Sequence, residues 1–161
     1  MIYKVTSDKT AKFLTIAVTL LFIGIAIGPK LFSKSENTEI SIISVVVLFL
    51  IYGISYGLSP NSYEINDNSI VIKRLFKNVI VNRSQIKNVL KLESGKLSGA
   101  IRMFASGGLF GYFGTFWNKE FGTMTWYATR RDKAIMLITI SNQKIILTPD
   151  ETDNFLNEFS T

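Results

Sequence analysis

Two long stretches without a charged residue dominate the first third of the chain. The first runs from Phe13 to Pro29 and the second from Ile40 to Tyr63. A helix that crosses the hydrocarbon core of a membrane needs about 20 consecutive, mainly apolar residues. The second stretch is apolar on every side over residues 42–51, and the rest of the chain offers little that could bury such a helix. The sequence therefore predicts a hairpin of two transmembrane helices in residues 1–60, with spans at about 12–32 and 40–58.

The first stretch has a second interpretation, as a cleaved secretory signal. Lys4, Lys9 and Lys12 would form its basic N-terminal region, and Gly24-Ile25-Ala26 would supply the small residues of a cleavage site. If the first stretch were removed, the second would still stop transfer across the membrane. Both interpretations therefore place the large C-terminal part on the same side.

The distribution of charge sets the predicted orientation. Residues 1–12 carry three lysines against one aspartate, residues 30–39 carry two of each sign, and residues 61–161 carry 13 basic against 9 acidic side chains. Cytoplasmic segments next to membrane spans are enriched in Lys and Arg. We therefore expect a multi-pass protein of the inner (cytoplasmic) membrane, with the N- and C-termini in the cytoplasm.

Two pairs of glycines four residues apart lie in the apolar stretches, Gly24 with Gly28 and Gly53 with Gly57. Such pairs permit the close approach of another helix. In an antiparallel hairpin the two pairs lie at opposite ends and cannot pack against each other. Each pair therefore receives a bulky side chain of the other helix or contacts a second molecule, and the second case predicts a homo-oligomer.

Residues 61–161 have a different character, with short alternating runs separated by turn residues. Met124, Trp126 and Ala128 alternate with polar residues as in a half-buried strand. Near the end, the segment 148–151 has the threonine, proline and glutamate of a helix start, and residues 152–159 carry one apolar stripe. These patterns predict a mainly-β barrel of about seven strands with a C-terminal capping α-helix, because a barrel leaves few strand edges exposed.

The glycine-aromatic segment 107–116, followed by 122–129, resembles a sequence motif of the bacterial pleckstrin-homology (PH) domain families. Members of these families end in a strand, a Pro-Asp step and a short helix, as residues 145–159 do. The resemblance covers roughly residues 61–160 and implies a PH-like barrel, often in a membrane protein. It implies a fold and a location, and no reaction.

The composition excludes several kinds of site. The chain has no His and no Cys, which excludes disulfides, thiol nucleophiles, Cys/His zinc sites and imidazole catalysis. Residues 107–114 lack the Gly-Lys-Ser/Thr ending of a phosphate-binding loop, and the carboxylates after Pro60 show no paired spacing. We expect no enzyme, no metal and no cofactor. The small excess of basic residues, interspersed with acids, also predicts no nucleic-acid partner.

The remaining candidates are contact residues. Basic and aromatic side chains at a domain surface suit anionic lipid or a protein partner, although the aromatic residues could instead pack into the barrel and the charges could simply be solvated. The candidates are Lys73, Arg74, Lys77, Arg102, Leu109, Phe110, Tyr112, Trp117, Lys119, Arg130 and Arg131. The sequence thus predicts a non-enzymatic, membrane-anchored binding module that contacts the lipid bilayer, a protein partner or both. The alternative is a homo-oligomeric membrane scaffold without a ligand.

Overall fold

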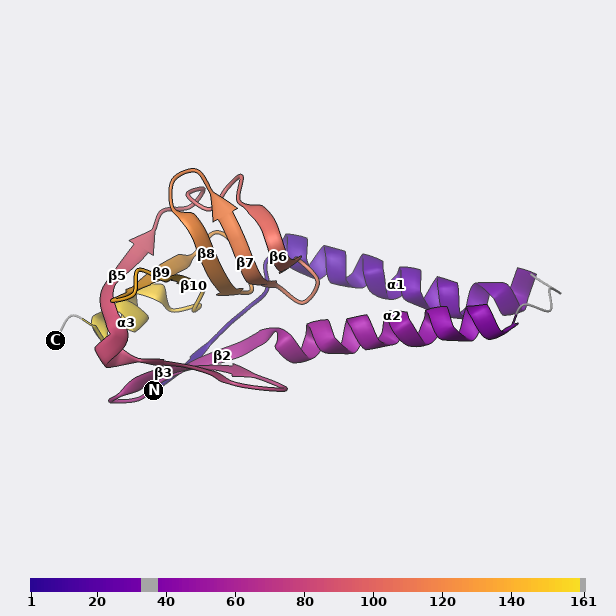
Figure 1. Cartoon of the computed structure of the whole chain (residues 1–161), viewed down its shortest axis with the longest axis horizontal. Helices are drawn as coiled ribbons and strands as arrows, with labels where there is room; N and C mark the ends of the chain where they lie inside the picture. The colour runs from indigo at the N-terminus through magenta and orange to yellow at the C-terminus, as the bar shows by residue number, and fades with distance from the viewer. Residues whose placement is uncertain (33–37, 160–161) are drawn as a thin grey trace.

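The structure is a computed structural model in which two long helices project side by side from one end of a β-rich domain (Figure 1). It describes the backbone of residues 1–32 and 38–159, and the side chains of residues 1–25, 27 and 42–159. The helices are α1 (Lys9–Phe32) and α2 (Thr38–Leu58). Helices are therefore present in both places where the sequence predicted the spans.

The prediction that these helices span a membrane is wrong for the described residues, where no helix has the length and apolar character that a crossing requires. A crossing helix needs about 20 mainly apolar residues in a row. The described part of α1 is interrupted by the charged and polar side chains of Lys9, Lys12, Thr15 and Thr19. The predicted location as a multi-pass inner-membrane protein is corrected on the same finding. The connection predicted between the spans falls largely outside the described residues.

The first sheet is formed by strands from both ends of the helical hairpin. It has four strands in the order β1-β2-β3-β4, all antiparallel. β1 pairs Tyr3 with Tyr63, so the first residues of the chain belong to a sheet, which the sequence did not predict. The strands are β1 (Ile2–Lys4), β2 (Pro60–Ile65), β3 (Ser69–Arg74) and β4 (Val79–Asn82).

The second sheet has six strands in the order β5-β9-β10-β8-β7-β6. Its neighbours are antiparallel except β10 and β8, which run parallel because the chain returns from β9 into the middle of the sheet. The strands are β5 (Ile86–Leu92), β6 (Ile101–Gly107), β7 (Tyr112–Asn118), β8 (Gly122–Ala128), β9 (Ala134–Thr139) and β10 (Lys144–Leu147). A short 3-10 helix, η1 (Arg83–Gln85), connects β4 to β5. The described residues therefore form ten strands, and nine of them, β2–β10, lie in the domain where about seven were expected.

The second sheet buries apolar side chains on both of its faces. One face packs on the first sheet, where Ile72 and Tyr63 meet Leu137 and Leu147. The other face forms a second cluster around Trp126, with other strands and the 93–100 connection contributing side chains. The alternation predicted for residues 124–128 is confirmed, because Met124, Trp126 and Ala128 are all buried.

The C-terminal helix is confirmed, but it begins later than the sequence predicted. α3 (Thr152–Asn157) follows an N-cap at Glu151. Thr148, the predicted cap, is instead fully buried between the sheets, where its hydroxyl accepts a hydrogen bond from the Thr129 N–H at 3.0 Å. Phe155 of the predicted apolar stripe is fully buried against the first cluster. The mainly-β domain with a terminal helix is therefore the part of the predicted fold that the structure supports.

Candidate functional site

A groove lies where β6, β7 and β8 meet the first turns of α1 and the last turns of α2, and it is called the β6 groove below. It encloses about 790 Å³. The residues that line it come mainly from six elements and are mostly apolar or small. They include Leu14, Ile54 and Leu58 from the helices, Arg74 from β3, Arg102, Met103, Phe104 and Ser106 from β6, Phe113 and Thr115 from β7, and Thr125 and Tyr127 from β8.

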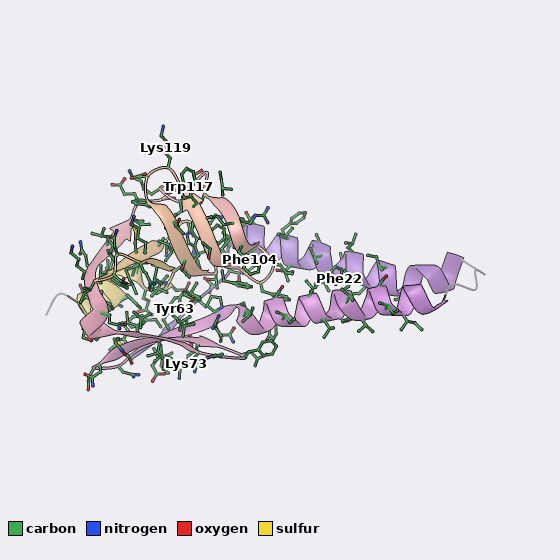
Figure 2. The ribbon with its side chains drawn as sticks, in the orientation of Figure 1. Phe22, Tyr63, Lys73, Phe104, Trp117 and Lys119 are labelled. Carbon is green, nitrogen blue, oxygen red and sulfur yellow. The ribbon has the colours of Figure 1, made fainter. Side chains whose placement is uncertain are left out.

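The rim of the β6 groove carries large apolar side chains in solvent. Phe104 is 88% exposed, Met103 63% and Ile101, at the start of the same strand, 60%. In Figure 2 Phe104 lies at the end of the domain beside the helices, whereas Trp117 and Lys119 lie at the far tip of the β7–β8 hairpin. The strand that forms the rim is therefore apolar and accessible over much of its length.

The charges in the β6 groove are all positive. Arg74 and Arg102 are the charged residues among those that line it, and none of the described lining residues is acidic. The Arg74 Nε donates to the Lys77 carbonyl at 2.7 Å, and its guanidinium lies 5.6 Å from the centre of the Tyr127 ring. The Arg102 side chain lies over Gly107, so closely that a side chain at Gly107 would collide with it. Neither guanidinium group has a carboxylate partner among the residues that the structure describes.

The glycine-aromatic segment joins the helices to the β-domain. Phe110 has a positive φ of 59° and its N–H donates to the Thr15 hydroxyl at 3.0 Å. Its ring lies 4.8 Å from that of Tyr52 and 5.2 Å from that of Tyr56, on α2. Phe110 thus fills the space between the two helices at their base. Its predicted contact with lipid or a partner remains untested.

Tyr112, another predicted contact residue, is buried. Its side chain is 1% exposed and its hydroxyl donates to the Asp8 carboxylate at 3.2 Å. Burial raises the pKa of Tyr112, and the negative charge of Asp8 adds to the effect. The Arg131 guanidinium stacks on the same ring, 4.3 Å from its centre. These three residues tie the start of α1 to β7.

The other predicted basic residues do not gather on one surface. Lys73 pairs with Glu64 at 2.7 Å and Arg130 with Asp132 at 2.6 Å, and each partnership lowers the pKa of the carboxyl group. Lys77 is exposed on the β3–β4 turn. Of the eleven predicted contact residues, the β6 groove brings together Arg74, Arg102 and Leu109.

The glycines predicted for helix contacts have different surroundings. Gly24 and Gly53 face open space, since a Cβ there would meet nothing within 4 Å. Gly57 instead faces the ring of Phe76, and the backbone N–H of Phe76 donates to the Gly57 carbonyl at 3.1 Å. Gly57 therefore contacts the β3–β4 turn. Gly28 lies outside the described side chains.

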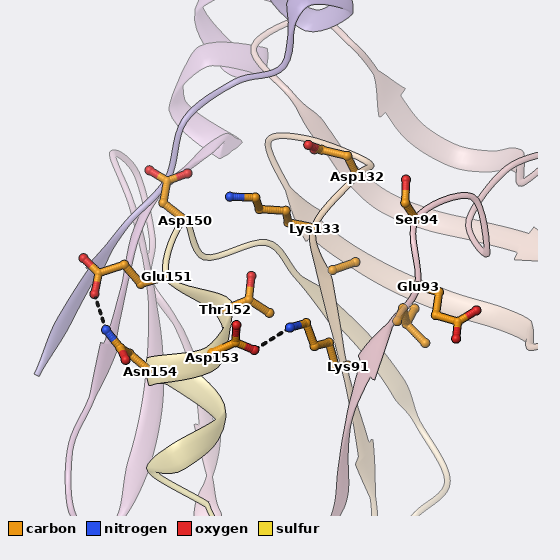
Figure 3. A pocket seen from close by; sticks show the side chains of 12 residues that line it. Lys91, Glu93, Ser94, Asp132, Lys133, Asp150, Glu151, Thr152, Asp153 and Asn154 are labelled. Carbon is orange, nitrogen blue, oxygen red and sulfur yellow. Dashed lines mark hydrogen bonds and ion pairs between the residues drawn. The ribbon is translucent and has the colours of Figure 1, made fainter.

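A second hollow, of about 440 Å³, lies between the end of β5 and the start of α3 (Figure 3). Most of its carboxylates have structural partners: Asp153 pairs with Lys91, Glu151 accepts from Asn154 at 2.7 Å, and Asp150 accepts from Thr6. Within the described part of the chain, no three acidic side chains are placed to hold a metal ion. This hollow is therefore explained by the packing of the C-terminal segment.

Sequence reasoning missed the rim of the β6 groove. Ile101, Met103 and Phe104 form an apolar run interrupted only by Arg102, which is an unusual composition for an exposed strand. That run was the available signal. Its exposure depends on β6 being the last strand of the sheet, which is set by the order of pairing and not by the residues of β6.

Comparison with known proteins gives a match for the β-domain. No curated protein and no solved structure matches the chain. The model of one protein family, described as a bacterial PH domain, matches residues 61–161, which include most of β2, all of β3–β10 and α3. The match covers more than half of the chain, and we conclude that this protein belongs to the bacterial PH domain family.

Proposed function

We propose that the protein is a non-catalytic binding module that holds a segment of a partner protein in the β6 groove. The PH domain supports a binding role, because such domains generally act by binding. The observation that carries the proposal is the groove itself, which combines about 790 Å³ of space with an apolar rim and two guanidinium groups. Large apolar side chains in solvent mark sites of interaction when they gather around a hollow.

The composition of the β6 groove defines the partner's chemistry. Phe104 and Met103 would be covered by apolar side chains of the partner, which is where most of the binding free energy of an interface arises. Arg74 and Arg102 would face one or more carboxylates, since charges across an interface are arranged with opposite signs. The expected partner segment is therefore both apolar and acidic.

Photo-crosslinking in cells that make the full chain tests this proposal. A photoreactive phenylalanine analogue at Phe104 is expected to form a discrete adduct with another protein. Ile140, which is 69% exposed on the β9–β10 turn, is the matched control position and should form none. The Arg102→Glu substitution should suppress the adduct at position 104, because it reverses the charge that the partner meets.

Three outcomes would contradict the proposal. The adduct at position 104 could be absent, it could form equally at position 140, or it could contain only phospholipid. The last outcome would instead indicate that Arg74 and Arg102 bind the phosphates of anionic lipid.

Self-association is a second candidate function, favoured by the exposed side chains of the helices. Phe13, Leu20, Phe49 and Leu50 are each more than half exposed, and apolar surface of this extent is normally covered. Gly24 and Gly53 face open space and would admit a helix of a second copy. In a mild detergent, sedimentation velocity should then show a dimer or larger species. Gly53→Leu should dissociate it, and a strict monomer for the unsubstituted chain would exclude this candidate.

A further inference from the structure

β6 is an open edge of the six-stranded sheet. Among the described strands it pairs only with β7, through a ladder that joins Ile101 to Trp117 and Gly107 to Tyr112. The backbone groups on its other side face away from the sheet along seven residues, a length of about 23 Å. Unpaired edges of this kind accept an added strand, because their N–H and C=O groups are already oriented for a ladder.

The other three edge strands are shorter than β6 or are covered by another element. β1 has three residues, and the carbonyl of Lys4 accepts a hydrogen bond from the Asp150 N–H at 3.1 Å. β4 has four residues. β5 is as long as β6, but α3 packs beside it and Asp153 of α3 pairs with Lys91 of β5. Of the described edges, β6 is the long one without a covering element.

A register shift in β6 determines which of its side chains share a face of the sheet. The ladder with β7 skips Met103, so that Phe104 is opposite Thr115 and Ser106 is opposite Phe113. Phe104 and Ser106 therefore share the face of the sheet on which Phe113 and Thr115 line the β6 groove. A strand added along β6 would present every second side chain to this groove.

The charges distinguish between possible occupants. Arg102 lies on the edge strand itself and Arg74, at the end of β3, also lines the β6 groove, with no acidic residue among the described lining residues. A second copy of the chain paired through β6 would add two more guanidinium groups to the same place, which is unfavourable. A foreign segment with carboxylates would neutralise them. The charge therefore favours a different protein over self-pairing.

We infer that the partner segment is an extended, acidic and apolar strand that adds to the free edge of β6 and places alternate side chains in the β6 groove. This inference rests on the proposed function and specifies how the groove is used. The ladder hydrogen bonds would supply affinity that does not depend on sequence, and the groove would select alternate residues.

Binding of synthetic peptides to the full chain in mild detergent tests the inference. The probe is a pool of seven-residue peptides in which apolar residues alternate with acidic residues or threonine, and the tightest binder is made in two N-methylated forms. Each form blocks one alternate set of backbone N–H groups. We expect one form to lose affinity by about tenfold or more and the other to change less than twofold, since only one set faces β6.

Hydrogen exchange and charge reversal supply the second readout. The peptide should slow exchange of β6 amides and leave those of β4 unchanged. Arg102→Glu should weaken binding by about tenfold, whereas Lys119→Glu, at the far tip of the β7–β8 hairpin, is the control and should have no effect.

The outcomes separate this inference from the proposed function. Equal effects of the two methylations, or unchanged exchange in β6, would overturn strand addition while the cross-link at position 104 still stood. Peptide dissociation constants above about 1 mM throughout the pool would also overturn it. Protection of β6 that grows with protein concentration in the absence of peptide would replace the foreign strand by a second copy. Loss of the position 104 cross-link would instead remove the proposed function itself.

Discussion

The two edges of the six-stranded sheet, β5 and β6, have the same length and opposite surroundings. Beside β5, α3 inserts Phe155, which is fully buried and lies 5.1 Å from the Tyr3 ring. At β6 the corresponding large aromatic, Phe104, is 88% exposed. The chain therefore covers the β5 edge with its own last helix and leaves the β6 edge open. We therefore expect the β5 side to contribute mainly to stability, while the proposed function assigns binding to the β6 side.

Truncating the two phenylalanines gives the largest expected difference. Phe155→Ala should lower the free energy of unfolding by about 3–5 kcal/mol, because it leaves a cavity in the core. Phe104→Ala should change it by less than about 0.5 kcal/mol, because its ring makes few contacts to lose. Urea denaturation followed by circular dichroism measures both. Similar losses for the two variants would show that the edges do not differ as we infer.

A substitution between β6 and β7 tests how firmly the open edge is fixed. Gly114 has a φ of +110°, and a Cβ there would collide with the backbone of Phe104 and Ala105. Gly114→Ala should therefore cost about 3 kcal/mol and speed hydrogen exchange in β6. Gly99→Ala is the matched control, since Gly99 also has a positive φ but faces open space. It should cost about 1 kcal/mol, and equal costs would mean that close packing of β6 is unimportant.

A buried tyrosine links the covered half of the domain to the β6 groove. The Tyr63 hydroxyl donates to the carbonyl of Tyr127, whose side chain lines the groove, and accepts from the Thr148 N–H at 3.1 Å. Burial raises the pKa of Tyr63 to about 12. In the unfolded chain the pKa is about 10, so between these values the unfolded state loses its proton first. The contribution of Tyr63 to stability is therefore complete below pH 10 and decreases as the pH rises toward 12.

Tyr63→Phe removes this dependence. Urea denaturation at a series of pH values should show the stability difference between the unsubstituted chain and the variant constant up to about pH 9. Between pH 10 and 12 that difference should shrink by about 2–3 kcal/mol. A parallel pH dependence in the two proteins would show that the Tyr63 hydroxyl ionises as freely as an exposed one.

Local patterns were enough to predict the β-domain and its last helix. The alternation at Met124, Trp126 and Ala128 corresponds to buried positions, and the stripe that includes Phe155 faces the core. The start of α3 was placed too early because Thr148 and Pro149 have the residue types of a helix start. The structure uses Thr148 to join two sheets instead, since its hydroxyl and its N–H both bond to groups far away in the sequence.

The candidate site was predicted only in part. Arg74, Arg102 and Leu109 were named as contact residues and line the β6 groove, but Phe104 and the helix residues that line it were not. Phe110, which was also named as a contact residue, packs between the helices. The membrane spans were inferred from uncharged length, and the described helices do not meet that requirement. In each case the prediction used residue type or uncharged length, which are local properties of the sequence. The position of a side chain in the fold depends on the neighbouring elements as well.

The sequence by itself determined the local structure of this protein: two apolar helices, a series of short strands, a terminal helix and a chain without His or Cys. These features depend on residue type and on spacing along the chain. Only the tertiary structure decided that β10 lies parallel to β8 and that β6 is left at an edge. It also brought Arg74 from β3 and Arg102 from β6 to the same groove. Strand order depends on which distant segments pair, and the free energy of those contacts is not contained in any one segment.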